Sequence, residues 1–535
     1  MPLPSDPTLD DPLAFPPLRV SAKAGRSGLA AALLVLIVHA GSYGFTSDDA
    51  FIVARYARNL VEGHGWVYNV GERVEGYTSF LWVALTALLA RLGVNYVTAV
   101  RALSLTGALA CAALMYRAAP RVGVPRESPL ACLGPALFAS TGAVACWALG
   151  GLEACGFALV VLAAVYLLNE ERPRSVQVAL AGLMCGLCML VRPEGILVFV
   201  GLALCLILEE GRKCWRRVGE LALPCAIIAG THLLWRHYYY GDWLPNTYYA
   251  KAGFGYHQCL RGYSYVHSFV ADHGGLILWV VPLVWPWASG GSLFARRCSL
   301  VAALLTLGVV LVGGDGLPMY RFMVPIVPLW AMLVQQLLAD LLRFAGRTEA
   351  QMGATAARVA LAGLIACLIV PLATPPELAW QYGMYRTQRH VEVPNWRAAG
   401  EWLAENARRD ASVACVPIGA VGYYSRLHIY DMMGLTDSHI AHKEMQLGTG
   451  RAGHEKHDGP YILSHRPTYL LLGNVQVLKM RLDPSDPTFV KPPNPEIRAR
   501  EDDIFMAELI DLYAKRVVEL PNGGYLHFLE RRPEL

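Results

Sequence analysis

The sequence predicts a polytopic α-helical membrane protein of about eleven transmembrane helices, followed by an exported α/β domain. Of its 535 residues, 55% are hydrophobic and only 16% are charged, whereas soluble proteins average about 25% charged residues. Apolar runs of about 14 to 21 residues recur up to residue 375, and the chain beyond that point is polar and rich in proline. These observations disfavour a single soluble domain.

Eleven apolar segments are predicted to span the membrane. They occupy residues 28–45, 97–116, 129–149, 152–168, 176–191, 195–208, 218–236, 274–290, 298–314, 322–342 and 356–374. The first segment follows basic residues as a signal peptide does, but we interpret it as a retained span because further spans follow. The apolar segment 80–93 is short for a hydrocarbon core of about 30 Å, and we expect it to form a helix at the membrane interface.

The basic residues set the predicted orientation. With the N-terminus in the cytoplasm, every cytoplasmic connection contains Arg or Lys, as the positive-inside rule requires. The odd number of spans then places the C-terminal region outside. The predicted parts are a cytoplasmic tail at 1–27, a transmembrane domain at 28–374 with a long first outer loop at 46–96, and an extracytoplasmic α/β cap domain at 375–535.

Net charge and motifs narrow the function classes. The chain has 46 Lys+Arg and 42 Asp+Glu, a net charge of +4, which is too small for a protein that coats nucleic acid. It contains no Walker loop and no GxGxxG motif that follows a strand. An ATP-driven pump and an enzyme that uses cytoplasmic nucleotide sugars are therefore disfavoured.

Charged residues of both signs gather at the predicted outer ends of the spans. The acidic residues are Asp48, Asp49, Glu153, Glu194, Asp242 and Asp315, and the basic residues are Arg192, Lys251 and Arg321. An ionisable group at membrane depth costs about 2.5 to 3.5 kcal/mol, so such groups usually face a cavity and have a function. We expect these side chains to meet in one pocket that opens to the exterior. The alternative is that each only marks a hydrated helix end.

The first outer loop begins with the patterned segment SDDAFIVARYARNL. Helical spacing places Ile52, Tyr56 and Leu60 on one face, and Arg55 and Arg58 on another. This pattern predicts an amphipathic helix that lies at the interface.

Two adjacent carboxylates, Asp48 and Asp49, begin this helix. They are predicted to raise each other's pKa or to attract a cation, and the alternative is that they only cap the helix. A carboxylate opposite cations suits sugar transfer from a polyprenyl-phosphate carrier, because a base must take the acceptor proton and cations must stabilise the departing phosphate. We therefore assign Asp48 or Asp49 as the base. The candidate phosphate-binding residues are Arg192, Lys251 and Arg321, and the candidates for binding sugar hydroxyls or a divalent cation are Glu153, Glu194 and Asp315.

Several motifs resemble those of bacterial membrane glycosyltransferases of the GT-C superfamily. They are SDDAFIVARYARNLVEGHGWVYNVGERVEGYTSFLW, GGLE, RPEG, GDWLPNTYYAK, GGDGLPMYRFMVPIVPL and IGAVGYYSRLHIYDMMGLTDSHIAH. Within the superfamily, the sequence is most similar to the group that contains the mycobacterial terminal β-1,2-arabinofuranosyltransferase.

This resemblance implies an eleven-span GT-C fold in the bacterial plasma membrane, with an exported cap domain and an acidic base that maps onto Asp48 or Asp49. It implies a polyprenyl-phosphate-linked sugar donor, with arabinofuranose as the candidate sugar, and a glycan or glycolipid acceptor of the cell envelope. Membrane lipids are expected partners, and nucleic acid is not. No cofactor is implied with certainty, and a divalent cation (Mg²⁺, Mn²⁺ or Ca²⁺) is the one candidate.

The C-terminal region is predicted to form a small α/β cap. An amphipathic helix is expected at 394–406, strands in SVACVPIGAVGYYS and RPTYLLLG, and a hairpin about Asn522-Gly523. The candidate acceptor-binding residues are Tyr423, Tyr424, Asp431 and Asp437. Core packing is the alternative for the two tyrosines, and it is slightly favoured.

Five of the 15 histidines fall between residues 439 and 465. Their spacing in HEKH differs from HExxH and no cysteine lies nearby, so we interpret the segment as a solvated loop rather than a metal site. Two other functions remain open at this point. A transporter or lipid flippase predicts charges near mid-bilayer, and a non-catalytic glycan-binding protein predicts tolerance of changes at Asp48 and Asp49.

Overall fold

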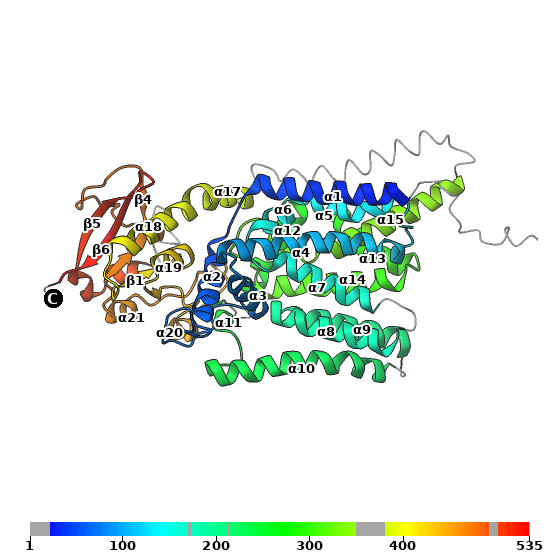
Figure 1. Ribbon diagram of the computed structural model, residues 1–535, viewed down its shortest axis with the longest axis horizontal. Coiled ribbons are helices and arrows are strands. Elements are labelled where there is room, and N and C mark those ends of the chain that lie inside the picture. The colour runs from blue at the N-terminus through cyan, green and yellow to red at the C-terminus, as the bar shows by residue number, and fades with distance from the viewer. Residues whose placement is uncertain are drawn as a thin grey trace, which may run out of the picture.

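The computed structural model describes residues 22–168, 173–211, 214–251, 253, 255–348, 380–491 and 501–533. A bundle of long helices is followed by a smaller unit that contains the strands, and this C-terminal unit lies at one end of the bundle (Figure 1). Helix α1 (Ala22–Tyr43) begins at the end of the bundle remote from the C-terminal unit and ends close to it.

The other bundle helices follow in chain order. They are α4 (Tyr96–Ala118), α5 (Leu133–Ser140), α6 (Gly142–Leu149), α7 (Ala154–Leu167), α8 (Ser175–Val191), α9 (Gly195–Glu210), α10 (Trp215–Tyr240), α12 (Tyr256–Asp272), α13 (Leu276–Ala288), α14 (Leu293–Val312) and α15 (Val327–Thr348). Each of the first ten predicted spans coincides with helical segments of this set. The eleventh, 356–374, lies outside the described residues. Helix α12 was not predicted.

Within the described residues, four helices are long and apolar enough to cross a membrane by themselves. They are Gly25–Tyr43, Tyr96–Val122, Trp215–Tyr240 and Leu293–Val312. The number is six if each of two bent helix pairs counts as one span. In these pairs, η2 (Pro129–Cys132) with α5 meets α6 at 67°, and α12 meets α13 at 98°. The described residues therefore have the helices of a multi-span membrane protein, and the count of eleven stays a prediction.

Glycines allow close helix packing at the centre of the bundle. A Cβ atom at Gly107 of α4 would lie 2.9 Å from the Cα of Gly156 of α7. A Cβ at Gly156 would in turn lie 2.5 Å from the Trp82 ring. Small residues at such crossings let helix backbones approach within van der Waals distance, which is a main source of association energy in lipid.

Three helices lie between the bundle and the C-terminal unit (Figure 1): α2 (Asp48–Val61), α3 (Phe80–Arg91) and α11 (Asn246–Lys251). Helix α3 matches the helix predicted at 80–93. Helix α2 matches the predicted amphipathic helix, but its polar face does not lie open to lipid headgroups. Arg55 and Arg58 are buried as fully as Ile52 and Tyr56, because the C-terminal unit covers that face.

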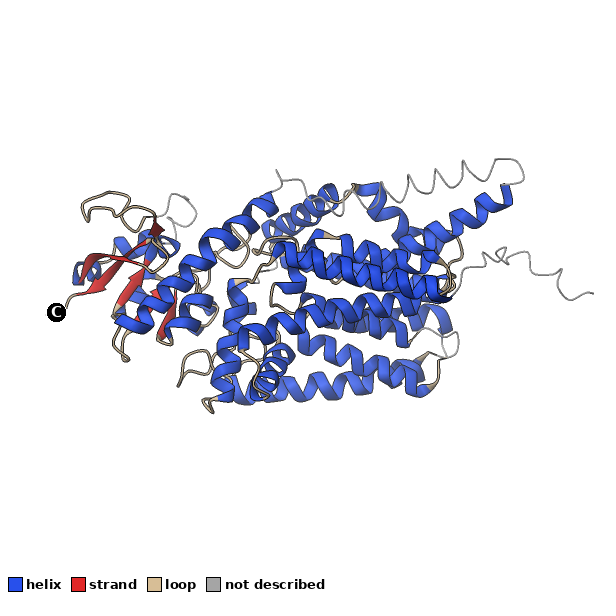
Figure 2. Ribbon diagram, turned by 45° about the horizontal axis from the view of Figure 1, so that its top comes forward, coloured by secondary structure: helices blue, strands red, loops and turns tan. Residues whose placement is uncertain are grey.

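The C-terminal unit combines short helices with one sheet (Figure 2). The helices are α17 (Trp380–Thr387), α18 (Val393–Asn406), α19 (Gly419–Ser425), α20 (Ser438–His442), α21 (Gly459–Ser464) and the kinked turn α22 (Leu472–Val475). The strands are β1 (Ser412–Cys415), β2 (His428–Asp431), β3 (Tyr469–Leu471), β4 (Val477–Leu478), β5 (Tyr513–Glu519) and β6 (Tyr525–Arg531). Short 3₁₀ or π segments are η1 (Ala119–Val122), η4 (Arg321–Met323), η5 (Gln388–Glu392) and η6 (Glu508–Leu512).

The sheet has the order β2-β1-β3-β6-β4, and β5 pairs with the other edge of β6. Strands β2, β1 and β3 are parallel, and β6 is antiparallel to its partners. The helix predicted at 394–406 and the hairpin predicted about Asn522-Gly523 are both confirmed, as α18 and as β5-β6 with Val517 opposite His527. The parallel strands place the β1–α19 turn against helix α2.

Candidate functional site

A cavity with about 440 Å³ of empty space, part of it open to solvent, lies where the bundle meets the C-terminal unit. Its lining comes from α2, from segment 76–79, from the turn before α7, from α11, from η4 and from one residue of the C-terminal unit. The lining residues are Asp49, Ile52, Val53, Gly76, Tyr77, Thr78, Ser79, Leu152, Glu153, Thr247, Lys251, Arg321 and Leu435.

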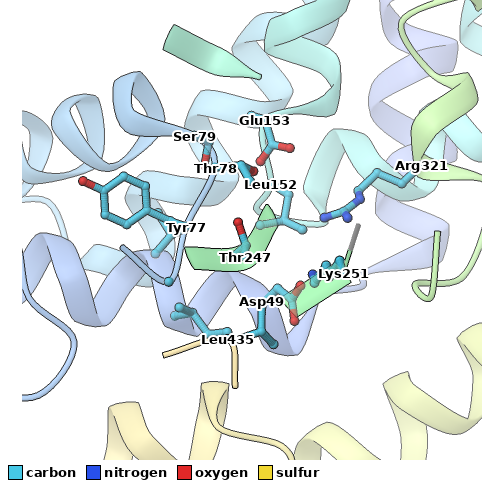
Figure 3. Close-up of a pocket in the computed structure, with 13 residues that line it drawn as sticks. Asp49, Tyr77, Thr78, Ser79, Leu152, Glu153, Thr247, Lys251, Arg321 and Leu435 are labelled. Atoms are coloured by element: carbon cyan, nitrogen blue, oxygen red, sulfur yellow. The ribbon is translucent and has the colours of Figure 1, made fainter. Parts of the chain in front are cut away.

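Charged side chains of both signs meet in this cavity. Asp49, Glu153, Lys251 and Arg321 all line it, and Figure 3 shows them around one space although they come from four distant segments of the chain. The other predicted site residues are not among those that line the cavity; they are Asp48, Arg192, Glu194, Asp315, Tyr423, Tyr424, Asp431 and Asp437.

The arginines near the cavity are held by carboxylates. Arg192 donates to Glu153 and to Glu194, each at 2.7 Å. Arg321 donates to both oxygens of Asp315, at 2.8 and 3.1 Å. These charge-assisted pairs orient the two guanidinium groups. Glu153 both lines the cavity and pairs with Arg192. Glu194 and Asp315 each pair with an arginine but are not among the residues that line the cavity.

The two carboxylates of α2 have different surroundings. Asp48 is buried and accepts backbone N–H bonds from Gly419 and Ala420, at 2.9 and 2.7 Å. Burial raises the pKa of the Asp48 carboxyl to about 7, although these two N–H bonds oppose the rise. Asp49 is half-buried and lines the cavity, and among the described residues its carboxylate has no hydrogen-bond or ion-pair partner. Helical geometry thus turns one carboxylate toward the C-terminal unit and the next toward the cavity.

Lys251 is the cation of the cavity that makes no ion pair within the described part of the chain. It lies at the end of α11, which is fixed from two sides. The side-chain amide of Asn246 donates to the carbonyls of Gly434 and Leu435, at 2.8 and 2.9 Å. The Asn246 N–H donates to the Glu75 carbonyl at 3.1 Å.

The side chain of Glu75 is held by a buried ion pair. Arg236 of α10 donates to both of its carboxylate oxygens, at 2.5 and 3.2 Å. Burial raises the pKa of Glu75 to about 7, although the charge of Arg236 opposes the rise. Sequence reasoning missed Glu75, Arg236 and Asn246. The signal for Asn246 was its position in the motif GDWLPNTYYAK, and the buried pair had no local signal because its members are 161 residues apart.

The four predicted acceptor-binding residues all have partners within the protein. The rings of Tyr423 and Tyr424 both pack against Phe51 of α2. Asp431 accepts N–H bonds from Met433 and Thr436 and holds that turn. Asp437 caps α20 and accepts the Tyr461 hydroxyl hydrogen bond. None of the four is among the described residues that line the cavity.

The predicted histidine-rich segment lies beside the bundle. Among the residues that the structure describes, no group of three or more His, Cys, Asp or Glu side chains has the geometry of a metal site. Glu455 of this segment instead pairs with Arg261 of α12 at 2.9 Å, and His439 pairs with Asp458 at 3.2 Å.

Two curated relatives are similar to the chain in sequence. The terminal β-(1→2)-arabinofuranosyltransferase of Mycobacterium tuberculosis is 32% identical over 255 residues, which cover 44% of this chain and 39% of the relative. The enzyme of the same name from Corynebacterium glutamicum is 27% identical over 334 residues, which cover 52% of this chain and 47% of the relative. The matches therefore span less than half the length of either relative.

Two solved structures share the fold. ArnT from Cupriavidus metallidurans, bound to undecaprenyl phosphate, has a TM-score of 0.53 at 13% identity and covers 75% of this chain and 84% of its own. The archaeal oligosaccharyltransferase AglB from Archaeoglobus fulgidus, in complex with an inhibitory peptide and a dolichol-phosphate, has a TM-score of 0.51 at 11% identity. It covers 94% of this chain and 74% of its own.

A family model described as a domain of unknown function (DUF8728) matches residues 381–515, which lie in the C-terminal region. Both solved structures are GT-C glycosyltransferases. The chain therefore has the GT-C fold of these membrane glycosyltransferases and is similar in sequence to the curated terminal β-(1→2)-arabinofuranosyltransferases.

Proposed function

We propose that this protein transfers a sugar from a polyprenyl-phosphate-linked donor to a glycan acceptor of the cell envelope, at the outer face of the plasma membrane. The names of the two curated relatives make arabinofuranose the candidate sugar. The observation that carries the proposal is the cavity in which the carboxylate of Asp49, which has no ion-pair partner among the described residues, lies with Lys251 and Arg321.

The proposed reaction is one displacement at the anomeric carbon. Asp49 takes the proton from an acceptor hydroxyl, and that oxygen forms a bond to the anomeric carbon of the donor sugar. The bond between this carbon and the phosphate oxygen breaks, and polyprenyl phosphate leaves with the electron pair. Lys251 and Arg321 stabilise the charge that develops on the leaving phosphate. The reaction needs no second carboxylic acid, because the phosphate is already a good leaving group.

The different surroundings of the two aspartates support different tasks for them in this proposal. Both oxygens of Asp48 already accept N–H bonds from the C-terminal unit, so we propose that Asp48 holds that unit against α2. Asp49 lines the cavity, and its carboxylate has no hydrogen-bond or ion-pair partner among the residues that the structure describes. A base must reach the proton that it removes. The proposal therefore assigns the base to Asp49.

The remaining charged residues support the cavity. We propose that Glu153 binds a sugar hydroxyl, since it lines the cavity, and that Arg192 orients it. Glu194 and Asp315 each pair with an arginine, so the proposal places no divalent cation on them. In the proposed topology the N-terminus is cytoplasmic, eleven helices span the membrane, and the C-terminal unit lies outside.

The test is turnover by the full-length protein in detergent or nanodiscs. Purified protein is incubated with a panel of polyprenyl-phosphate sugars and cell-envelope glycan acceptors, and mass spectrometry follows donor consumption and product mass. We expect one donor to be consumed, and Asp49→Asn to lower kcat about 10²- to 10⁴-fold, the usual contribution of a general base. Asp410→Asn, at an exposed position that is not among the residues lining the cavity, is the control. Wild-type protein that consumes no donor, or Asp49→Asn protein with normal turnover, would contradict the proposal.

A further inference from the structure

Thr247 lines the cavity with a buried polar atom that lacks a hydrogen-bond partner within the described part of the chain. The Thr247 hydroxyl is buried and makes no hydrogen bond to any described residue, and the residue is only 5% exposed. Buried hydroxyls are normally hydrogen-bonded, because desolvation without a partner is unfavourable. Thr247 lines the cavity, and Figure 3 shows its side chain at the centre of the lining residues. This location indicates that the missing partner belongs to a molecule that enters the cavity.

The backbone holds this hydroxyl in a defined position. Thr247 follows Asn246, whose side chain and N–H tie α11 to the Leu435 carbonyl and to the Glu75 carbonyl. Thr247 and Lys251 are four residues apart on α11 and therefore lie on the same helix face. The hydroxyl is thus fixed one helical turn from the ammonium group of Lys251.

The lining of the cavity contains both charged and neutral polar groups. Lys251 and Arg321 supply positive charge suited to a phosphate. Thr247 adds a neutral hydroxyl, and Tyr77, Thr78 and Ser79 line the same cavity with further neutral groups. A hydroxyl can both donate and accept a hydrogen bond, and a sugar hydroxyl offers both complementary roles.

We propose that the Thr247 hydroxyl binds a hydroxyl of the donor sugar and contributes to the choice of that sugar. This inference rests on the proposed function. A site that hydrogen-bonds a substrate hydroxyl discriminates strongly against an analogue that lacks it, because the buried group of the site is then left unpaired. Thr247 is therefore expected to help distinguish hydroxylated sugars from their deoxy analogues.

The test compares Thr247→Val with Thr247→Ser. Valine keeps the shape of threonine without the hydroxyl, and serine keeps the hydroxyl. We expect Thr247→Val to lower kcat/KM for the donor about 10-fold, the effect of one lost hydrogen bond, and Thr247→Ser to stay near the wild type. Thr86→Val is the matched control, because Thr86 is equally buried but donates to the Trp82 carbonyl outside the cavity.

Product inhibition separates the sugar from the phosphate. Polyprenyl phosphate lacks the sugar, so its inhibition constant should be the same for wild type and Thr247→Val. An inhibition constant raised by the same factor as the loss in kcat/KM would overturn the inference, because it would place Thr247 on the phosphate. An active wild type with an equally active Thr247→Val variant would overturn the inference and leave the proposed function standing. A wild type that neither binds nor consumes any polyprenyl-phosphate sugar would overturn both.

Discussion

Arg55 of α2 holds the C-terminal unit against the bundle. It is 4% exposed, and its guanidinium donates to the carbonyls of Gly422 and Leu427, at 2.7 and 2.8 Å. It also donates to the Tyr68 carbonyl at 2.8 Å and to the Asn69 side chain at 3.0 Å. Arg55→Met keeps much of the apolar volume but removes all four bonds, so we expect it to loosen the contact between α2 and α19.

The size of the effect follows from these four bonds. A hydrogen bond from a charged donor contributes about 1.5 to 3 kcal/mol, so four bonds at the lower figure sum to roughly 6 kcal/mol. The variant also escapes the cost of burying a guanidinium group, which reduces the net loss. We therefore expect a net loss of about 3 to 5 kcal/mol, which is less than the sum over the four bonds.

Two measurements on the purified full-length protein check this value. Hydrogen exchange of segment 419–427 should become roughly 10²- to 10³-fold faster if about 3 to 4 kcal/mol of docking free energy is lost. Thermal unfolding should begin at a lower temperature. Donor turnover should also fall, because Asp49 is on the same helix as Arg55.

Arg408→Met is the matched control, because Arg408 pairs with Asp410 at the surface with 84% of its side chain exposed. Surface pairs of this kind contribute little, and the control should show no measurable change. Equal exchange rates at 419–427 in Arg55→Met and Arg408→Met proteins would refute the assigned role of Arg55.

Three further predictions concern the same contact and the support of the cavity. Gly419→Ala should lower the unfolding temperature and the activity together, because a Cβ at Gly419 would lie 2.0 Å from the Asp48 carbonyl oxygen; unchanged melting would contradict this packing. Folding raises the pKa of Asp48 from 3.8 to about 7. Between these two pH values the folded chain keeps a proton on Asp48 that the unfolded chain has released, so the contribution of Asp48 to stability decreases as the pH rises from about 4 to 7. Unfolding temperatures at several pH values should show a smaller decrease over this window in Asp48→Asn than in the wild type, and parallel curves would disprove the role of this carboxyl. Arg236→Met should cost about 3 to 5 kcal/mol, because it leaves the Glu75 carboxylate buried without its partner; adding Glu75→Gln should recover part of the loss in a chemical denaturation assay, and no recovery would show that the charge of Glu75 is not the cause.

Local patterns were sufficient for most of the helices and for the β5-β6 hairpin. Apolar runs predicted ten helical segments of the bundle, since the burial of apolar side chains in lipid or protein depends on local composition. The Asn522-Gly523 turn predicted the hairpin because its backbone requires residues that tolerate a positive φ angle, and Gly523 has a φ of 78°. Helix α12 escaped prediction because it is rich in polar residues and in aromatic rings.

Long-range contacts decided the details of the candidate site. Periodicity identified a polar face on α2, but only the packed structure shows that Arg55 and Arg58 face the C-terminal unit. The adjacent aspartates were equivalent by sequence, and the N–H groups of Gly419 and Ala420 distinguish them. Those groups lie 371 and 372 residues from Asp48 along the chain, a separation at which no local pattern operates.

The sequence by itself determined a multi-span helical protein with a C-terminal α/β unit and charged residues of both signs at one predicted end of the spans. Composition and residue periodicity suffice for this, because both act over one or a few helical turns. The tertiary structure decided which of those charges share a cavity and which are neutralised by a partner. It also decided that the hydroxyl of Thr247 has no hydrogen-bond partner among the described residues. Pairing and burial depend on how distant segments pack, and packing free energy is a property of the whole fold.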